Sequence, residues 1–256
     1  SPAEAVVVGG FTDLVDLLRT RAGEAATEDN CTAVVDPASG VLAQTWDMHK
    51  SAEDYVFVFR MFPDSGPSSI VFTTAGCLGQ IGMNEAGIAV GINNLTSWGK
   101  PGVTWPFVVR KVLAQTDFEA AVDAAVLADL AGGHNYLILG PDGAGANIEA
   151  MPGHKEVTRV AGEPFVHTNH CLAPVTVGQE APRLDEAKVS SDIRLKLGSE
   201  LARDLEALFA EPAISRHGVN PEDTSTCGAV IMRPAEGSMR AIWGVPGDGP
   251  WETLKL

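Results

Sequence analysis

Hydrophobic and polar positions along the chain change their spacing near Cys31. Within residues 11–21 the apolar residues recur three and four positions apart, which predicts an amphipathic helix. Residues 23–30 are small and polar, which is typical of a linker. From Cys31 onward, short apolar runs rich in β-branched residues alternate with turn residues, and this pattern predicts strands joined as hairpins.

Turn residues mark the ends of the predicted strands. Pro, Gly, Asn and Asp gather at residues 36–40, 63–67, 84–87 and 234–237, and Gly87 occupies a position that favours a left-handed backbone. Most of the chain after Cys31 is therefore assigned to sheets. The strands are expected at residues 32–35, 41–46, 55–61, 70–74, 80–83, 88–92, 136–140, 146–150, 156–160, 165–168, 226–232 and 239–245.

Helical periods return between these strand groups. Helices are expected at residues 106–115 and 117–130, with Pro106 in the first turn of one and Asp117 capping the other. A long helix is expected within residues 185–209. Hairpins with helices grouped between them favour an α+β fold with antiparallel sheets over alternating βαβ units. The length of 256 residues fits one domain.

Composition narrows the function classes. With 45% hydrophobic residues the chain has enough apolar surface for a substantial core. The net charge of −15 repels phosphate backbones, so we expect no nucleic-acid partner. No apolar run approaches about 18 residues, and no basic-apolar leader follows Ser1, so we expect neither a membrane span nor a signal peptide.

Cysteine spacing bears on cofactors and compartment. The chain has four cysteines, and no two of them form a C-x-x-C pair, so a zinc cluster or redox dithiol lacks support. We therefore expect no metal and no cofactor, and a reducing, cytoplasmic location. The four positions are Cys31, Cys77, Cys171 and Cys227.

Cys31 lies between the predicted linker and the first predicted strand. A free thiol is mostly protonated at neutral pH and needs a base to become a nucleophile. A neighbouring His can supply that base. At a chain terminus, the residue's own α-amine, with a pKa of about 7.7 to 8.0, can do so instead. A lone cysteine is more often simply buried, so this position alone leaves both interpretations open.

Four motifs occur in order along the chain: Cys31-Thr32, Gln-Thr-Trp-Asp at residues 44–47, a long block at 79–93 that ends in Gly-Ile-Asn, and Val-His-Thr-Asn-His at 166–170. Together they resemble the acyl-CoA:6-aminopenicillanic-acid acyltransferase-like family. Its members are self-cleaving cysteine peptidases (peptidase C45 type) related to the choloylglycine hydrolases. The resemblance extends over most of the chain.

The resemblance implies a four-layer αββα fold of the N-terminal-nucleophile class, with two antiparallel sheets between helical layers. It also implies self-cleavage between Asn30 and Cys31. Residues 1–30 would then be a propeptide-like α-chain and residues 31–256 the catalytic β-chain, two chains of one processed precursor. A homodimer is left open. Family members often have Gly before the nucleophile, and Asn30 departs from that pattern.

The same resemblance implies roles for particular residues. Asp47, 16 positions after Cys31, matches the family's Asp, and a carboxylate beside a terminal ammonium would hold it in place. Asn169 matches the family's Asn, whose amide N–H would stabilise the tetrahedral oxyanion. Asn93 aligns with a position that contributes to the oxyanion site in the choloylglycine branch; the alternative is a polar residue ending a strand.

Two further residues are candidates for substrate or oxyanion binding. Thr32 adjoins the nucleophile and either hydrogen-bonds locally or serves only as a β-former. His167 invites a general-base or metal interpretation, but without other ligands nearby in the sequence it more readily orients Asn169 or packs. Relatives often carry an Arg near the start of the penultimate strand. Residues 222–226 contain none, and neither Arg233 nor Arg240 can be assigned to that role from the sequence.

The sequence therefore predicts an autoprocessing amidohydrolase that cleaves a small N-acyl amide through a Cys31 acyl-enzyme. Hydrolysis is favoured because it requires no second binding site. Two alternatives remain open at this stage. One is an N-acyltransferase that moves the acyl group to an amine acceptor, and the other is a non-catalytic binding protein with the same fold.

Overall fold

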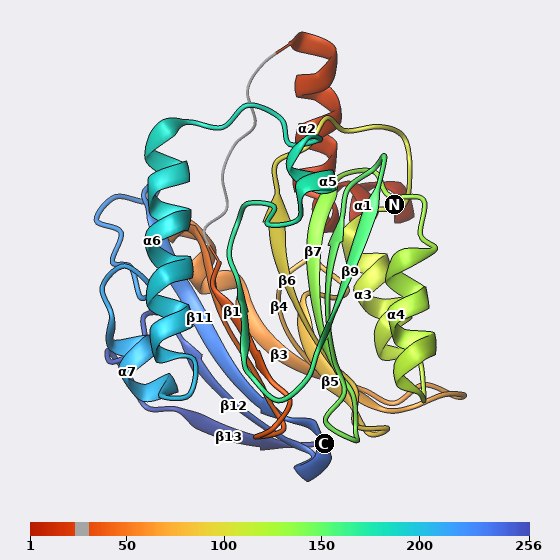
Figure 1. Ribbon diagram of the computed structural model, residues 1–256, viewed down its shortest axis with the longest axis vertical. Coiled ribbons are helices and arrows are strands. Elements are labelled where there is room, and N and C mark those ends of the chain that lie inside the picture. The colour runs from red at the N-terminus through yellow and green to blue at the C-terminus, as the bar shows by residue number, and fades with distance from the viewer. Residues whose placement is uncertain (24–30) are drawn as a thin grey trace.

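Two antiparallel sheets lie face to face in the computed structural model, which describes residues 1–23 and 31–256 (Figure 1). Helices cover the outer face of each sheet, so the layers run helix, sheet, sheet, helix. This arrangement confirms the α+β, four-layer αββα fold. Asn30, one half of the expected cleavage site, lies outside the described residues.

The first sheet (sheet A) has six strands in the order β10-β1-β2-β11-β12-β13. Its middle is the long pairing of β2 with β11, which is interrupted by a register shift between Thr226 and Gly228. The second sheet (sheet B) has seven strands in the order β3 to β9. The strands of sheet A are β1 (Ala33–Asp36), β2 (Val41–His49), β10 (Phe165–His167), β11 (Thr224–Arg233), β12 (Ser238–Trp243) and β13 (Glu252–Lys255). Those of sheet B are β3 (Val56–Met61), β4 (Ser69–Thr74), β5 (Ile81–Asn84), β6 (Ala89–Leu95), β7 (Gly133–Leu139), β8 (Gly145–Ala150) and β9 (Lys155–Val160).

Two helical layers complete the sandwich. Helices α3 (Trp105–Leu113) and α4 (Phe118–Val126) pack on sheet B, and α6 (Asp185–Leu201) and α7 (Leu205–Ala210) pack on sheet A. The Asp117 side chain accepts a hydrogen bond from the Ala120 backbone, which confirms the predicted cap of α4. The other helical elements are α1 (Pro2–Gly9), α2 (Phe11–Ala22), α5 (Pro174–Val177), η1 (Lys50–Tyr55) and η2 (Pro234–Glu236).

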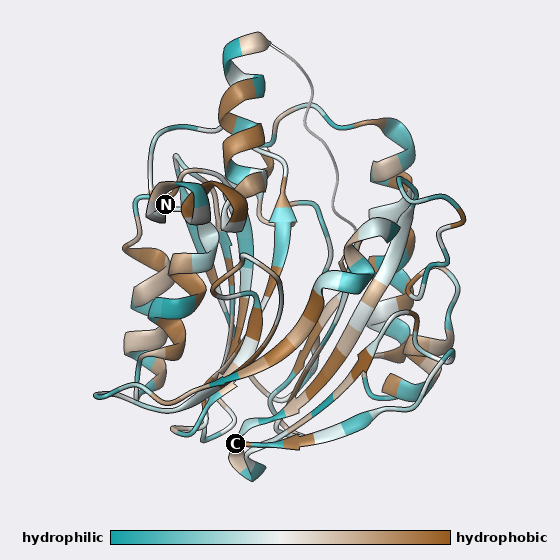
Figure 2. Cartoon of the chain, turned by 180° about the vertical axis from the view of Figure 1, so that it is seen from behind, coloured by the Kyte–Doolittle hydropathy of each residue, from teal (hydrophilic) through white to brown (hydrophobic). Residues whose placement is uncertain are grey.

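The main hydrophobic core fills the space between the sheets and under α3 and α4. Brown, hydrophobic segments run along the strands of both sheets in Figure 2. Leu42, Phe72 and Ile138 are among the fully buried side chains there. Each such side chain stabilises the fold by about 1.5–3 kcal/mol relative to leaving it exposed. A second cluster lies between the outer face of sheet A and helices α6 and α7.

The long helix expected within residues 185–209 is confirmed as α6, and a second, shorter helix, α7, begins inside the same range. The break falls at residues 202–204, where the Asp204 side chain accepts a hydrogen bond from Ala207 N and caps α7. An Asp at this position satisfies an amide at the start of the new helix, which stabilises a restart. The α4 helix also ends earlier than expected, at Val126.

The N-terminal segment formed by α1 and α2 packs closely against the body of the sandwich (Figure 1). A Cβ placed on Gly99 would lie 2.5 Å from the backbone nitrogen of Leu17, and one on Gly10 would lie 2.7 Å from Cβ of Thr104. Asp13 and Asp16 of α2 are buried. Glycine at these contacts therefore lets backbone and side chain approach closely. None of the helices described is both long and apolar enough to span a membrane.

Candidate active site

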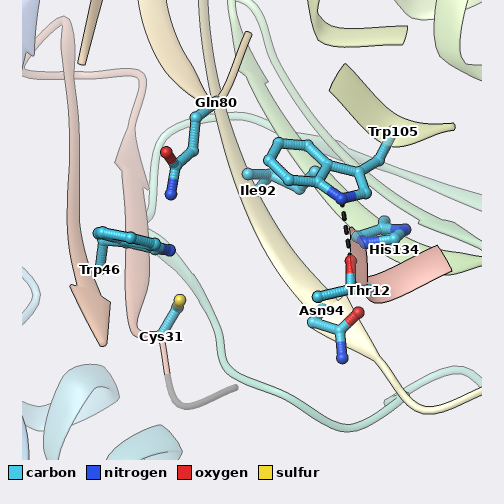
Figure 3. Close-up of a pocket in the computed structure, with 8 residues that line it drawn as sticks. All are labelled: Thr12, Cys31, Trp46, Gln80, Ile92, Asn94, Trp105 and His134. Atoms are coloured by element: carbon cyan, nitrogen blue, oxygen red, sulfur yellow. Dashed lines mark hydrogen bonds between the residues drawn. The ribbon is translucent and has the colours of Figure 1, made fainter. Parts of the chain in front are cut away.

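Cys31 lies two residues before the start of β1 and is 3% exposed. Its sulfur points into a small pocket between Trp46, Gln80 and Asn94 (Figure 3). The pocket volume is about 30 Å³, which is room for a water molecule or a very small group. The full lining comprises Thr12, Cys31, Trp46, Gln80, Ile92, Asn94, Trp105 and His134.

Side chains from β6, from α6 and from the loop after β10 hold both backbone polar groups of Cys31. The Cys31 amide nitrogen donates to Oδ1 of Asn169 at 2.8 Å. The Cys31 carbonyl oxygen accepts from Nδ2 of Asn93 at 3.2 Å and from Nη1 of Arg194 at 2.6 Å. In the uncut chain this nitrogen belongs to a peptide bond, and it is the atom that cleavage would turn into the α-amine. The backbone of Cys31 is thus fixed from both sides.

Asn93 and Asn169, the two expected oxyanion residues, are brought together at Cys31. Nδ2 of Asn169 also donates to the Asn94 carbonyl at 3.1 Å, and Oδ1 of Asn93 accepts from Nδ2 of Asn135 at 3.5 Å. Both amide side chains are therefore fixed by their own partners. In this state their contacts to Cys31 orient its backbone, and their role toward an oxyanion remains a prediction.

Asp47 is fully buried on β2, opposite Thr226 of β11. Its Oδ1 accepts a hydrogen bond from the Thr226 hydroxyl at 2.8 Å. Burial raises the pKa of Asp47 to about 7, against the opposing effects of the Arg194 charge and the Thr226 hydrogen bond. The Asp47 carboxyl therefore belongs to a buried network with Arg194. Its expected contact with a terminal ammonium remains a prediction.

Arg194 is a residue that the sequence interpretation missed. It comes from the middle of α6, is completely buried, and donates to Oδ1 of Asn169 at 3.1 Å as well as to the Cys31 carbonyl. Burial lowers the pKa of Arg194 to about 10, while the negative charges of Asp47 and Cys31 act in the opposite direction. A guanidinium thus contacts Cys31, although residues 222–226 at the start of β11 contain no Arg.

No apolar stripe in the sequence marks Arg194 as buried, because Val189 and Ile193 of the same helix are exposed. The buried residues of α6 are Ala187, Ser191, Arg194 and Gly198, which recur three and four positions apart. A charged residue on the buried stripe of a helix is rare unless it has partners. Arg233 and Arg240, the two arginines considered in the sequence, instead line a cavity on the outer face of sheet A.

Thr32 is buried next to Cys31. Its backbone nitrogen donates to the Thr45 hydroxyl at 3.2 Å, and its own hydroxyl accepts from Nη1 of Arg194 at 3.3 Å. These contacts place Thr32 in the same network as the Cys31 backbone. The side chain is not among those that line the pocket described above.

His167 is close to Asn169 in the sequence but does not line the Cys31 pocket. Its Nε2 lies 3.1 Å from Oε1 of Glu149, and its Nδ1 lies 2.8 Å from the Thr168 carbonyl. Both ring nitrogens face oxygen acceptors, an arrangement that an imidazolium satisfies by donating from both. His167 therefore joins β10 to β8 of the other sheet, which holds the start of the loop carrying Asn169.

Glu149 holds the C-terminal end of the loop that carries Asn169. Its carboxylate accepts hydrogen bonds from Leu172 N at 2.6 Å, from Ala173 N at 3.1 Å and from the Thr176 hydroxyl. Burial favours a higher pKa for Glu149, but the charge and hydrogen bond of His167 and these donors outweigh it and lower the pKa to about 2. A single carboxylate thus orders both flanks of the Asn169 loop.

Replacing Glu149 with Gln is expected to destabilise the protein by on the order of 3 kcal/mol at pH 7. A folded-state pKa depressed from 4.5 to about 2 stabilises the protein above pH 4.5, and that stabilisation is lost as the pH falls toward 2. The difference between wild type and E149Q should therefore shrink to less than about half by pH 3. Urea unfolding at both pH values measures it.

The Glu156→Gln variant is the matched control, because Glu156 forms an exposed pair with His154 at 3.9 Å. It should change stability by less than about 0.5 kcal/mol at either pH. An E149Q protein as stable as E156Q at pH 7 would show that the Glu149 carboxylate does not hold the loop.

The N-terminal segment forms part of the pocket wall (Figure 3). The Trp105 indole donates to the Thr12 hydroxyl at 2.9 Å, and the Trp105 backbone nitrogen donates to Oδ2 of Asp13 at 2.9 Å. Asp13 lies 3.6 Å from Nδ1 of His134. Burial raises the pKa of Asp13 to about 7 and lowers that of His134 to about 3, so the two groups are favoured as a neutral pair between these two pH values.

Among residues 1–23 and 31–256, no group of three or more His, Cys, Asp or Glu side chains is arranged to hold a metal ion. All four cysteines are buried and form no disulfide. The site at Cys31 combines a buried thiol, a backbone held by amide and guanidinium groups, and a small adjacent pocket.

Solved structures with this architecture place the chain in a class. The fold matches a mutant of the conjugated bile acid hydrolase from Clostridium perfringens with a TM-score of 0.59 and 12% identity, covering 89% of this chain and 92% of that one. The Caenorhabditis elegans N-acylethanolamine-hydrolyzing acid amidase ortholog matches with a TM-score of 0.53 and 14% identity, covering 80% and 93%. The fold is that of the N-terminal-nucleophile hydrolases.

Within that class, the chain belongs to the acyl-coenzyme A:6-aminopenicillanic acid acyl-transferase family, whose model matches residues 34–217. It is 28% identical over 156 residues to the 40 kDa form of acyl-coenzyme A:6-aminopenicillanic-acid-acyltransferase from Emericella nidulans. That match covers 59% of this chain and 43% of the relative, so the chain corresponds to less than half of the relative's length.

Proposed function

We propose that this protein is an autoprocessing amidohydrolase that cleaves a small N-acyl amide with Cys31 as its nucleophile. The observation that carries the proposal is the way Cys31 is held. Its backbone nitrogen donates a hydrogen bond to Asn169, and its carbonyl oxygen accepts hydrogen bonds from Asn93 and Arg194. Its side chain lines a pocket. Holding a nucleophile in one geometry removes much of the entropic barrier to attack. Membership of the acyltransferase family supports chemistry at an acyl carbon.

Self-cleavage would use the same thiol. The Cys31 sulfur adds to the carbonyl carbon of Asn30, the C–N bond breaks, and the nitrogen takes a proton to become the Cys31 α-amine. The resulting thioester is hydrolysed by water, which leaves a carboxylate on Asn30 and regenerates the thiol. The hydrogen bond from the Cys31 nitrogen to Asn169 would then orient the new amine.

Amide hydrolysis would follow the same sequence of bonds. The α-amine of Cys31 takes the thiol proton, and the thiolate attacks the carbonyl carbon of the substrate. The leaving nitrogen takes the proton as its bond to carbon breaks, and water hydrolyses the thioester to a carboxylic acid. A side-chain amide carries two N–H donors, of which Asn169 uses one on the Asn94 carbonyl. The second is the proposed donor to the oxyanion.

The pocket favours a short acyl group. Its volume of about 30 Å³ is far below the roughly 300 Å³ at which drug-sized ligands are bound, and Trp46, Ile92 and Trp105 provide apolar surface. A larger acyl group would require these side chains to move. Acyl transfer is the alternative, and the name of the Emericella nidulans relative supports it.

Hydroxylamine distinguishes hydrolysis from transfer in one experiment. The protein is incubated with N-acyl-p-nitroanilides of increasing chain length, with and without hydroxylamine, and the products are separated by mass spectrometry. We expect carboxylic acid in water, hydroxamate with hydroxylamine, and rates that fall as the acyl chain lengthens. A transferase would release acyl product at a substantial rate only with an amine acceptor present. A folded protein that forms no acyl adduct on the peptide containing Cys31 would favour the binding-protein alternative.

A further inference from the structure

A second and much larger cavity lies on the outer face of sheet A, away from Cys31. Its volume is about 590 Å³, within the range of about 300–1,000 Å³ that is usual for small-molecule sites. It forms because α6 and α7 pack over β10, β1, β2 and β11, while the hydrophobic cluster beneath them includes no residue of β12 or β13. The outer face of the sheet therefore continues beyond its helical cover (Figure 1).

The strand register brings the lining residues together. Ile231 of β11 pairs directly with Arg240 of β12, so the two side chains share one face. Arg233, two residues after Ile231, lies on the same face. Arg240 in turn pairs with Thr253 of β13, which puts Trp251, two residues earlier, on that face as well. Strands β11 and β12 thus supply two arginines, and the residue that precedes β13 supplies an indole, to one surface.

Aromatic rings form one wall of the cavity. Phe209 of α7 stacks on Trp251 with centroids 5.7 Å apart and an interplanar angle of 22°. The Arg240 guanidinium lies over the Trp251 ring, 5.3 Å from its centroid. A guanidinium stacked in this way keeps its N–H edges free for a planar anion. A flat apolar body can lie against the same rings.

The charges of the lining favour an anion. Arg203, Arg233 and Arg240 line the cavity, against one acidic lining residue, Glu206. Arg203 and Arg233 have exposed partners, Glu163 at 2.8 Å and Glu236 at 4.0 Å, and such pairs are weak and exchange readily. Among the described residues no carboxylate lies within ion-pair distance of Arg240. Three cations around one cavity stand out in a chain whose net charge is −15.

We propose that this cavity binds a small anion with a flat apolar body, in chemical class an aryl carboxylate. The carboxylate meets the edge of the Arg240 guanidinium and the side chain of Arg233. The ring lies against Trp251 and Phe209. This site is separate from the Cys31 pocket, shares no lining residue with it, and does not depend on the proposed reaction.

The test uses 4-phenylbutyrate as the probe and the indole N–H signals of ¹⁵N-labelled full-length protein as the readout. The chain has five tryptophans, and the Trp251→Phe variant assigns the Trp251 signal. We expect a saturable shift of that signal. The neutral amide, 4-phenylbutyramide, should bind about tenfold more weakly or worse, because it lacks the charge-assisted hydrogen bonds.

Arg240→Leu should weaken 4-phenylbutyrate binding by about tenfold or more without weakening the amide. Arg159→Leu is the matched control, because Arg159 also lies over an aromatic ring, 5.4 Å from the centroid of Phe118, but outside this cavity. It should bind like the wild type, as should Cys31→Ala. The spectrum of each variant reports whether it is folded.

Three results would overturn the proposal. Equal binding of the acid and the amide would show that the arginine side chains only cover apolar surface with their aliphatic stems. Unchanged binding in a folded Arg240→Leu protein would exclude the guanidinium as the anion site. Shifts confined to Trp46 and Trp105 would place the probe in the Cys31 pocket instead.

Discussion

Cys31→Ala protein is expected to remain one uncut chain in a denaturing mass spectrum, whereas the wild type separates into fragments that end at Asn30 and begin at Cys31. The same change should lower amide hydrolysis by on the order of 10⁴-fold or more, because the nucleophile forms the acyl-enzyme in both reactions. Alanine removes only the buried sulfur and leaves the backbone contacts to Asn93, Asn169 and Arg194 available. A loss of cleavage and amidase activity in this variant would therefore be due to the missing thiol and not to a disrupted site.

Cys77→Ala is the matched control for the loss of a buried thiol. The Cys77 sulfur is also buried, lies 3.4 Å from the Gly79 carbonyl, and does not line the pocket at Cys31. Cleavage and turnover should both persist in this variant. Amidase activity in a purified Cys31→Ala protein would refute the mechanism. An uncut wild-type chain with no activity would point to a stalled precursor or to a binding protein.

Arg194→Lys is expected to fold but to lose about 10²-fold in kcat, with a smaller change in KM. The guanidinium reaches Cys31, Thr32 and Asn169 together through the two nitrogens of its fork. A lysine ammonium is a point charge that cannot reproduce this geometry, and a misplacement of about 1 Å can cost about 10²-fold in rate. Steady-state kinetics on a substrate from the amide screen separates kcat from KM.

Arg194→Met removes the charge as well and is expected to destabilise the protein by about 3–5 kcal/mol, because Asp47 loses a buried cation. Without that cation the pKa of Asp47 should rise further, so the penalty grows as the pH increases through 7. Lys196→Met is the control on the same helix, because Lys196 is exposed. Wild-type kcat and complete self-cleavage in Arg194→Lys would show that the guanidinium only fills space.

Much of the fold follows from local patterns, and its departures have local causes. The hairpins, the Asp117 cap and the first amphipathic helix could be predicted because each depends on neighbours in sequence. Helix α1 was missed because its run of three valines looks like a strand, although Ser1 and Glu4 form a capping box. Strand β13 was missed because only four residues pair there, with mixed polarity.

The candidate site divides in a similar way. Sequence motifs were enough to predict Cys31, Asn93 and Asn169 as site residues. The structure brings both asparagines within hydrogen-bonding distance of the Cys31 backbone. Arg194 could not be placed, because its contact with Cys31 depends on how α6 packs on sheet A, across 163 positions of sequence. The sequence did not mark the buried face of α6 either, because apolar residues of this helix such as Val189 and Ile193 are exposed.

Thr12 and Cys31 line the same pocket, although Thr12 precedes the proposed cleavage site in the sequence and Cys31 follows it. A cleaved protein would therefore keep its pocket on two polypeptides with no covalent link between them, held together by contacts such as that between Asp13 and Trp105. Folding of the precursor brings the walls together within one molecule, but refolding of the cleaved form would require a diffusional encounter. At low concentration, unfolding would become effectively irreversible, so the lifetime of the mature protein would be set by its unfolding rate.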